Sequence, residues 1–213
     1  SCWITAHDAD TGEELWRRNT IPRIGEPNGE SWGDLPNEQR RGGSAWMPAS
    51  FDPELNLIFI GIAVPIPWGT IQRDTKGGDV LYTNSTLALD AETGEIDWYF
   101  QHIPGGNWDQ DHPFERLIVE TDVVPDADAV SWLNPNIDSS ARRKVITGVP
   151  GKPGIVRTLD AATGDFLWAT ETNYQNVIVG ADVEKRQGIT NPELDITEIA
   201  QRKLVCPTTQ GGI

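Results

Sequence analysis

The sequence predicts an all-β protein assembled from repeated units of four antiparallel strands. Three observations carry this prediction: one turn pattern occurs three times with identical internal spacing, apolar strand-like runs precede each copy, and helix is expected only in short pieces. The pattern is Asp-x-x-Thr-Gly-x-x-x-Trp, and its copies span Asp8–Trp16, Asp90–Trp98 and Asp160–Trp168.

Each copy of the pattern predicts a strand, a tight turn and a returning strand. The Asp and Thr side chains can close such a turn through local hydrogen bonds, and the Gly tolerates a positive φ. The Trp at the end of the pattern can anchor the returning strand against a neighbouring unit.

Two further strands precede the second and third copies. The run from Trp46 to Ile62 predicts a strand, an Asp-Pro turn and a second strand, and residues 116–120 and 144–148 supply the same pair before the third copy. Sheets of four antiparallel strands that repeat along a chain are typical of a β-propeller, in which each sheet is one blade.

The repeats divide the whole chain, residues 1–213, into parts of a propeller that cannot close into a ring by itself. We expect a longer protein, with both ends of this sequence lying inside it. The predicted parts are the end of one blade at 1–18, a blade at about 45–101, a blade at about 116–172, and a connection into a further blade at 173–213. Within that connection we expect 173–205 to be irregular, with a helical turn near Ile196–Ala200.

Charge argues against a nucleic-acid partner. The 213 residues contain 32 acidic and 17 basic side chains, a formal net charge of −15, whereas binding to phosphates requires clustered Lys and Arg. Cys2 and Cys206 lie at opposite ends, so they can pair with each other or with cysteines elsewhere in a longer protein. Within these 213 residues we find no signal-peptide pattern and no apolar run of membrane-spanning length, so we expect that any targeting segment was removed or lies outside this sequence.

The segment after Trp98 contains the most reactive combination of residues. A loop with two glycines leads into Trp108-Asp109-Gln110-Asp111, an aromatic residue followed by carboxylates on alternate positions. Taken alone, a loop aspartate most often caps a turn. His7, His102 and His112 lack metal-ligand spacing, and no Cys-x-x-Cys-His haem motif occurs.

Several segments together resemble the pyrroloquinoline quinone-dependent (PQQ-dependent) alcohol dehydrogenases, whose fold is an eight-bladed β-propeller with tryptophan-docking repeats. The resemblance covers nearly the whole chain and includes Arg41–Trp46, Tyr82–Asp90, Trp98–His102, Asn107–Asp109 and Cys206–Pro207. The Thr-Gly-Trp repeat alone is also similar to non-enzymatic propellers such as the outer-membrane assembly lipoprotein.

The resemblance implies roles for five residues. Trp46 falls where the family places the indole beneath the planar quinone, and Ser44 could bond the cofactor edge; ordinary alternatives are inter-blade packing and a turn hydroxyl. Asp109 matches the catalytic base and a metal ligand, and Asp111 an additional ligand in lanthanide-using members. Lys152 matches the cation beside the quinone oxygens, although a Lys in a Pro/Gly turn is ordinarily solvated.

One position departs from the family pattern. Val64 stands where the family has an Asn that coordinates calcium, and the family's Glu ligand would fall before Ser1. Binding of calcium or a lanthanide therefore depends on Asp109 and Asp111, with cofactor oxygens.

Two functions remain open. The resemblance implies a periplasmic enzyme that oxidises an alcohol and passes electrons to an acceptor such as a cytochrome c, alone or as an oligomer. Val64 favours the alternative, a related non-catalytic propeller that acts as a protein-binding scaffold.

Overall fold

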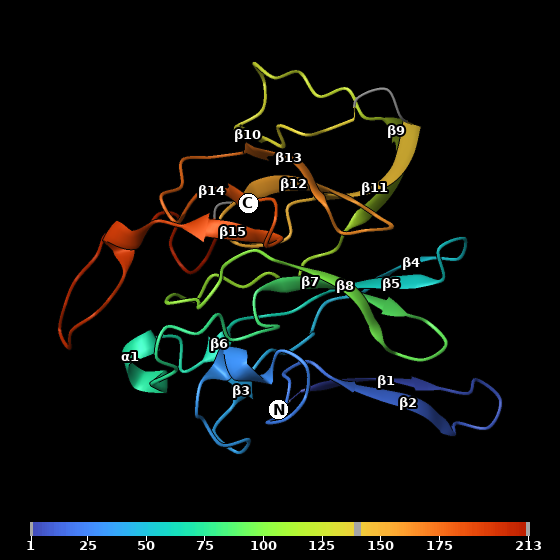
Figure 1. Cartoon of the computed structure of the whole chain (residues 1–213), viewed down its shortest axis with the longest axis horizontal. Helices are drawn as coiled ribbons and strands as arrows, with labels where there is room; N and C mark the ends of the chain where they lie inside the picture. Colours follow the sequence, from blue (N-terminus) through green and yellow to red (C-terminus); the bar gives the residue numbers. More distant parts are fainter. Residues whose placement is uncertain (1, 139–141, 212–213) are drawn as a thin grey trace.

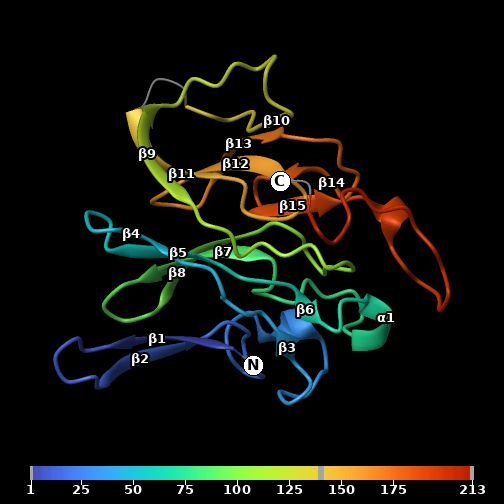
Figure 2. The ribbon, with the colours of Figure 1, turned by 180° about the vertical axis from the view of Figure 1, so that it is seen from behind.

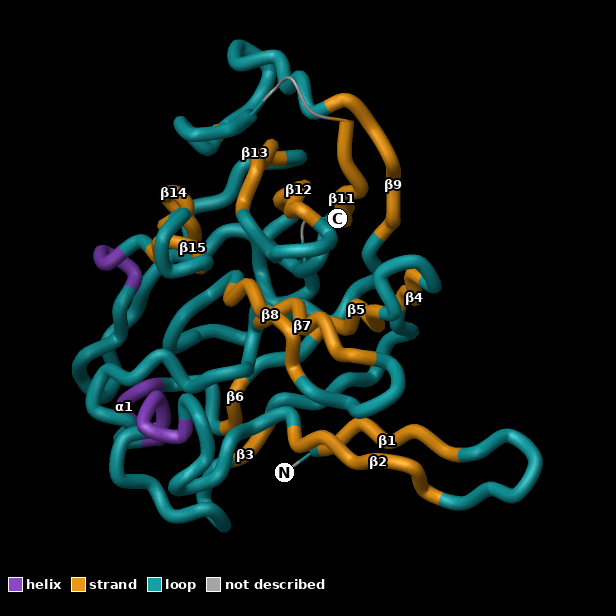
Figure 3. Tube along the Cα trace, turned by 45° about the vertical axis from the view of Figure 1, so that its right-hand side comes forward, coloured by secondary structure: helices purple, strands orange, loops and turns teal. Residues whose placement is uncertain are grey.

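Three layers of antiparallel strands stack on one another in the computed structural model, which describes residues 2–138 and 142–211 (Figures 1 and 3). The first layer is a hairpin of β1 (Trp3–His7) and β2 (Glu14–Asn19). The second contains β4 (Ser50–Asp52), β5 (Leu57–Gly61), β7 (Ser85–Asp90) and β8 (Ile96–Gln101). The third contains β9 (Leu117–Asp122), β11 (Arg142–Gly148), β12 (Ile155–Asp160) and β13 (Phe166–Glu171).

In the second and third layers the four strands pair in chain order, as neighbouring antiparallel strands. The smaller elements lie at the edges and between the layers. They are β3 (Arg41–Gly42) paired with β6 (Pro65–Ile66), β10 (Trp132–Leu133) beside β13, the 3-10 helix η1 (Gly29–Trp32) and the short helix α1 (Thr70–Arg73). The predicted all-β architecture is confirmed; the blade boundaries stay predictions.

In all three predicted turns the Asp side chain accepts hydrogen bonds from the same two backbone amides. Asp90 Oδ1 accepts from the amides of Glu92 and Thr93, at 3.0 and 2.8 Å, and from the Thr93 hydroxyl at 3.0 Å. Gly94 follows with φ of 68°, which L side chains rarely adopt. The carboxylates of Asp8 and Asp160 accept from the equivalent amides of their own turns.

The tryptophans that end the first two turn patterns join successive layers. Trp16 Nε1 donates to the carbonyl of Ala91 at 3.0 Å, and Trp98 Nε1 donates to the carbonyl of Ala161 at 3.1 Å. Each indole also lies on the turn glycine of the following layer. Trp168 is half-buried and packs on Val123, Val145 and Leu167, and within the described residues its indole nitrogen donates no hydrogen bond.

Both faces of the second layer are buried, which explains the continuous apolar run in β5. Leu57 and Phe59 pack with Trp98 and the third layer, whereas Ile60 packs with Trp16 of the hairpin. Successive side chains of a strand point to opposite faces, so a sheet covered on both sides needs apolar residues at every position.

The prediction of an irregular stretch at 173–205 is wrong, because a hairpin of β14 (Ile178–Asp182) and β15 (Gln187–Thr190) forms there. Asp182 Oδ1 accepts from the amides of Glu184 and Lys185, so a side-chain-closed turn forms without Thr-Gly. β15 reaches the second layer through one parallel bridge between Gln187 and Gln101.

The predicted helical turn near Ile196–Ala200 is also wrong. The 3-10 helix of this region, η2 (Pro192–Leu194), comes earlier, because the Asn191 side chain accepts from the Glu193 amide and caps it at that point. Among the described helices, none is long and apolar enough to cross a membrane.

The alternating strand directions place three connections at one end of the sheets. These are the segments between β5 and β7, between β8 and β9, and between β11 and β12, whereas the Thr-Gly turns lie at the other end. In Figure 1 the β1–β2 turn points to the right and α1 lies on the left, and Figure 2 shows the same arrangement from behind. Two of these connections carry predicted functional residues: Asp109 and Asp111 lie between β8 and β9, and Lys152 lies between β11 and β12.

Candidate active site

Lys152 lies between two carboxylates from a different sheet connection. Its Nζ is 3.2 Å from Asp109 Oδ1 and 2.7 Å from Asp111 Oδ2. All three side chains are largely shielded, with exposed fractions of 15% for Lys152, 23% for Asp109 and 12% for Asp111. The structure therefore brings three of the five predicted site residues into one ion-paired cluster.

Backbone contacts hold the two connections together. The amide of Lys152 donates to the carbonyl of Asp111 at 3.0 Å. A Cβ at Gly151 would lie 2.5 Å from that carbonyl oxygen and 2.4 Å from the ring of His112, so only glycine permits this approach.

The ammonium of Lys152 is stabilised by its partners. Burial alone would lower the pKa of Lys152, but hydrogen bonds and charge interactions with Asp111 and Asp109 outweigh it and raise the pKa above its ordinary value. Lys152 is therefore positively charged at neutral pH.

The second oxygen of Asp111 is also engaged. Asp111 Oδ1 accepts from the amide of Val64 at 3.2 Å, so the backbone of Val64 contacts the cluster. The same segment pairs with the Ser44 region: Ala63 N donates to Ser44 O at 2.9 Å, and Gly43 N donates to Val64 O at 3.0 Å. The Ala63–Val64 backbone therefore lies between Ser44 and Asp111 and is hydrogen-bonded to both residues.

Trp46 presents an unusually open aromatic surface. Its side chain is 54% exposed, and the one aromatic ring that it contacts among the described residues is Phe114, edge-to-face, at a centroid distance of 6.1 Å. Phe114 belongs to the β8–β9 connection that also carries Asp109. A large indole that is not covered by protein suits a planar ring system stacked upon it.

The side chains of this site are less suited to binding a metal cation than to binding a planar organic group. The described residues contain no cluster of three or more His, Cys, Asp or Glu side chains that could hold a metal ion. Asp109 and Asp111 already surround the positive charge of Lys152. These residues therefore do not by themselves form a calcium or lanthanide site.

Sequence reasoning missed a stacked histidine pair beside this cluster. The rings of His102 and His112 are fully buried and parallel, with centroids 4.8 Å apart and an interplanar angle of 8°. The only signal in the sequence is that they bracket the loop containing Asp109 and Asp111.

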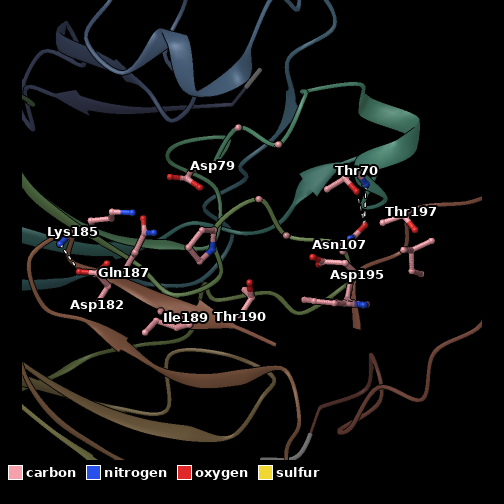
Figure 4. Close-up of a pocket in the computed structure, with 18 residues that line it drawn as sticks. Thr70, Asp79, Asn107, Asp182, Lys185, Gln187, Ile189, Thr190, Asp195 and Thr197 are labelled. Atoms are coloured by element: carbon pink, nitrogen blue, oxygen red, sulfur yellow. Dashed lines mark hydrogen bonds between the residues drawn. The ribbon is translucent and has the colours of Figure 1, made fainter. Parts of the chain in front are cut away.

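A pocket lies beside this loop (Figure 4). It has a volume of about 560 Å³, and Asn107 and Trp108, which directly precede Asp109, form part of its wall. Asn107 Oδ1 accepts from the amide and hydroxyl of Thr70, at 2.9 and 3.1 Å, which ties the loop to α1. None of the five predicted site residues lines this pocket.

The comparison with protein families identifies the fold. Residues 1–130 match the family described as the β-propeller domain of glucose, ethanol and alcohol dehydrogenases that use PQQ. The chain belongs to this family. The three layers are accordingly parts of a β-propeller, and they do not close into a ring.

Individual members of this family are similar to the chain beyond residue 130 as well. Quinohemoprotein alcohol dehydrogenase ADH-IIG of Pseudomonas putida is 32% identical over 99% of this chain and 29% of its own length. Its solved structure has a TM-score of 0.82 and covers 98% of this chain.

Two further solved structures support the same fold. The quinohemoprotein alcohol dehydrogenase of Comamonas testosteroni has a TM-score of 0.72 at 29% identity, with 90% of this chain and 28% of that chain covered. A europium-containing methanol dehydrogenase, with a TM-score of 0.76 and 22% identity over 99% of this chain and 36% of its own, shares the fold. The chain thus spans about a third or less of the proteins it matches.

Proposed function

We propose that the longer protein containing this chain oxidises an alcohol with bound PQQ, and that Asp109, Lys152 and Trp46 are part of its active site. The observation that carries this proposal is the position of Lys152 Nζ between Asp109 Oδ1 and Asp111 Oδ2, within a chain of this dehydrogenase family. Oxidation of alcohols is the activity named for the relatives.

Each residue has a defined task in this proposal. Trp46 offers its exposed indole for stacking and fixes the orientation of the planar cofactor, and the Ser44 hydroxyl bonds its edge. Lys152 holds a positive charge beside the oxygens on which negative charge develops. The cofactor, when bound, supplies the acceptor for the hydride of the alcohol.

Asp109 has a free atom with which to act as general base. Lys152 occupies Oδ1, whereas Oδ2 has no hydrogen-bond partner among the described residues. We infer that Oδ2 takes the hydroxyl proton of the alcohol, and the 23% exposure of the side chain leaves it accessible to a small substrate. We further propose that the enzyme passes its electrons to an acceptor such as a cytochrome c and that it is located in the periplasm.

The test uses the full-length protein reconstituted with PQQ, with calcium or a lanthanide as separate conditions. Asp109→Asn should retain cofactor binding but lower alcohol-dependent dye reduction by about two to four orders of magnitude, because the base is lost. Asp97→Asn, an exposed position on β8, is the matched control and should leave both properties unchanged. Equal turnover of Asp109→Asn and wild type would refute the assignment of the base.

Val64 supports a second candidate function, a non-catalytic scaffold. Its side chain supplies no ligand at the position where an Asn would coordinate a cation. If full-length wild-type protein binds no PQQ with either metal, the scaffold becomes the better explanation.

A further inference from the structure

A second polar cluster lies buried behind the loop that carries Asp109 and Asp111. Arg116 and Arg157 are 5% and 4% exposed, and His102 is 1% exposed. With Thr86 these residues line a small cavity between the second and third layers, which has a volume of about 10 Å³. That is room for one water molecule or one monatomic ion.

The hydrogen bonds around Thr86 determine which nitrogen of the His102 ring carries the proton. Arg116 donates to Thr86 Oγ1 through both Nε, at 3.0 Å, and Nη2, at 2.7 Å. A hydroxyl has two acceptor sites, so Thr86 must donate its own proton to His102 Nε2, 2.8 Å away. The proton of the neutral His102 ring is therefore on Nδ1, which is a buried donor without a partner.

Arg157 is the least satisfied group of the cluster. Among the described residues its guanidinium donates no hydrogen bond, and Nη2 is fully buried. Burial lowers the pKa of Arg157 to about 9, and burial together with the charge of Arg157 lowers the pKa of Arg116 to about 9. Neither shift has a contribution from a carboxylate.

Two buried guanidiniums without a counterion are costly, because a charge removed from water needs a partner of opposite sign. A water molecule would satisfy donors but would not neutralise the charge. The lining presents N–H donors from Arg157 and Arg116 and offers no carboxylate.

We propose that this cavity binds one small inorganic anion of the size of chloride, with Arg157 as its principal partner. The size of the cavity selects against sulfate, phosphate and organic carboxylates. His112 stacks on His102 and contacts Gly151, which precedes Lys152, so the bound anion would lie directly behind the two connections that form the candidate active site.

The direct test is crystallographic and uses the full-length protein. Crystals grown in sodium bromide should show an anomalous difference peak at the bromine edge, within hydrogen-bonding reach of Arg157. A water molecule there, or a carboxylate from another part of the protein that fills the cavity, would overturn the proposal.

A second test compares variants in solution. In sodium chloride the midpoint of thermal unfolding of wild type should be at least about 2 °C higher than in sodium gluconate of equal ionic strength, because gluconate is too large to enter. Arg157→Met should lose this difference. Arg202→Met removes an exposed arginine and should keep it.

Two results of the variant experiment would contradict the anion site. If wild type shows no preference for chloride, or if Arg157→Met keeps the full preference, the proposal is wrong. If Arg157→Met does not fold, the bromide map of wild type decides the question by itself.

Discussion

At the scale of single residues, the candidate site depends on a lysine that holds two carboxylates together. Asp109 and Asp111 lie two positions apart on one loop, where their charges would repel each other without a cation between them. Lys152 comes from the β11–β12 connection of the next layer, so the ion pairs also link two parts of the chain that are far apart in sequence. Charge neutralisation and the positioning of the loop therefore depend on the same side chain.

Replacing Lys152 with Met should destabilise the full-length protein by about 1–2 kcal/mol, because two shielded carboxylates lose their partner. Lys76→Met is the matched control. Lys76 pairs with Asp34 at 2.9 Å, but the two side chains are 63% and 88% exposed, so we expect a smaller loss. Unfolding midpoints in urea measure both changes, and equal losses would contradict the importance of the shielded site.

The contribution of Lys152 should also depend on pH in one direction. Since its pKa is raised above the ordinary 10.5, the stabilisation is fully present below that value and is lost as the pH rises through the higher folded-state pKa. The stability difference between wild type and Lys152→Met should therefore stay constant from pH 7 to about pH 9 and shrink only in strong alkali.

At the scale of elements, the repeated turn combines a backbone requirement with a packing requirement. Gly12, Gly94 and Gly164 all have a φ near 70°, but only the latter two lie beneath an indole. A Cβ would be 2.4 Å from Trp16 at Gly94 and 2.5 Å from Trp98 at Gly164, whereas nothing lies within 4 Å at Gly12.

Gly12→Ala should therefore measure the backbone strain alone, about 1–2 kcal/mol. Gly94→Ala and Gly164→Ala should cost a further 1–3 kcal/mol or so, because each methyl group would displace a packed indole. Thermal unfolding of the three variants in the full-length protein tests this order. Three equal losses would show that the indole contacts contribute little.

The sequence allowed the turns and the fold to be predicted because their cause is local. Asp, Thr and Gly close each turn within a few residues. The β14–β15 hairpin escaped prediction since Asp182 closes its turn without the Thr-Gly pair.

Candidate site residues could be named only through resemblance, because their contacts are long-range. Lys152 is far from Asp109 in the chain, and no local pattern predicts that they meet. The burial of Arg116 and Arg157 could not be predicted, because arginine in a strand pattern is ordinarily solvated and nothing local indicates that these two are buried.

At the scale of the molecule, the layers leave surfaces that a complete propeller would cover. The β1–β2 hairpin exposes Trp3 at 52% and Leu15 at 62%, and the outer strand β9 exposes Leu117 at 62%. Since this chain spans 29% of its relative from Pseudomonas putida, further blades are the natural partners of these surfaces.

The 213 residues expressed alone should consequently associate or aggregate, because open strand edges and apolar faces lack partners. Light scattering coupled to size-exclusion chromatography measures the state, with the full-length protein as the control. A monomeric species with one cooperative unfolding transition would show that this piece is an independent domain.

The indole hydrogen bonds of Trp16 and Trp98 both run in the same direction along the chain, from an earlier layer to the turn of the next one. During translation Trp16 therefore has no acceptor until Ala91 has left the ribosome, and Trp98 must wait for Ala161. The indole of each of these two layers would therefore lack its hydrogen-bond acceptor until the turn of the following layer has been synthesised. While these blades are being made, the growing end of the protein would thus hold one inter-blade contact that is still incomplete.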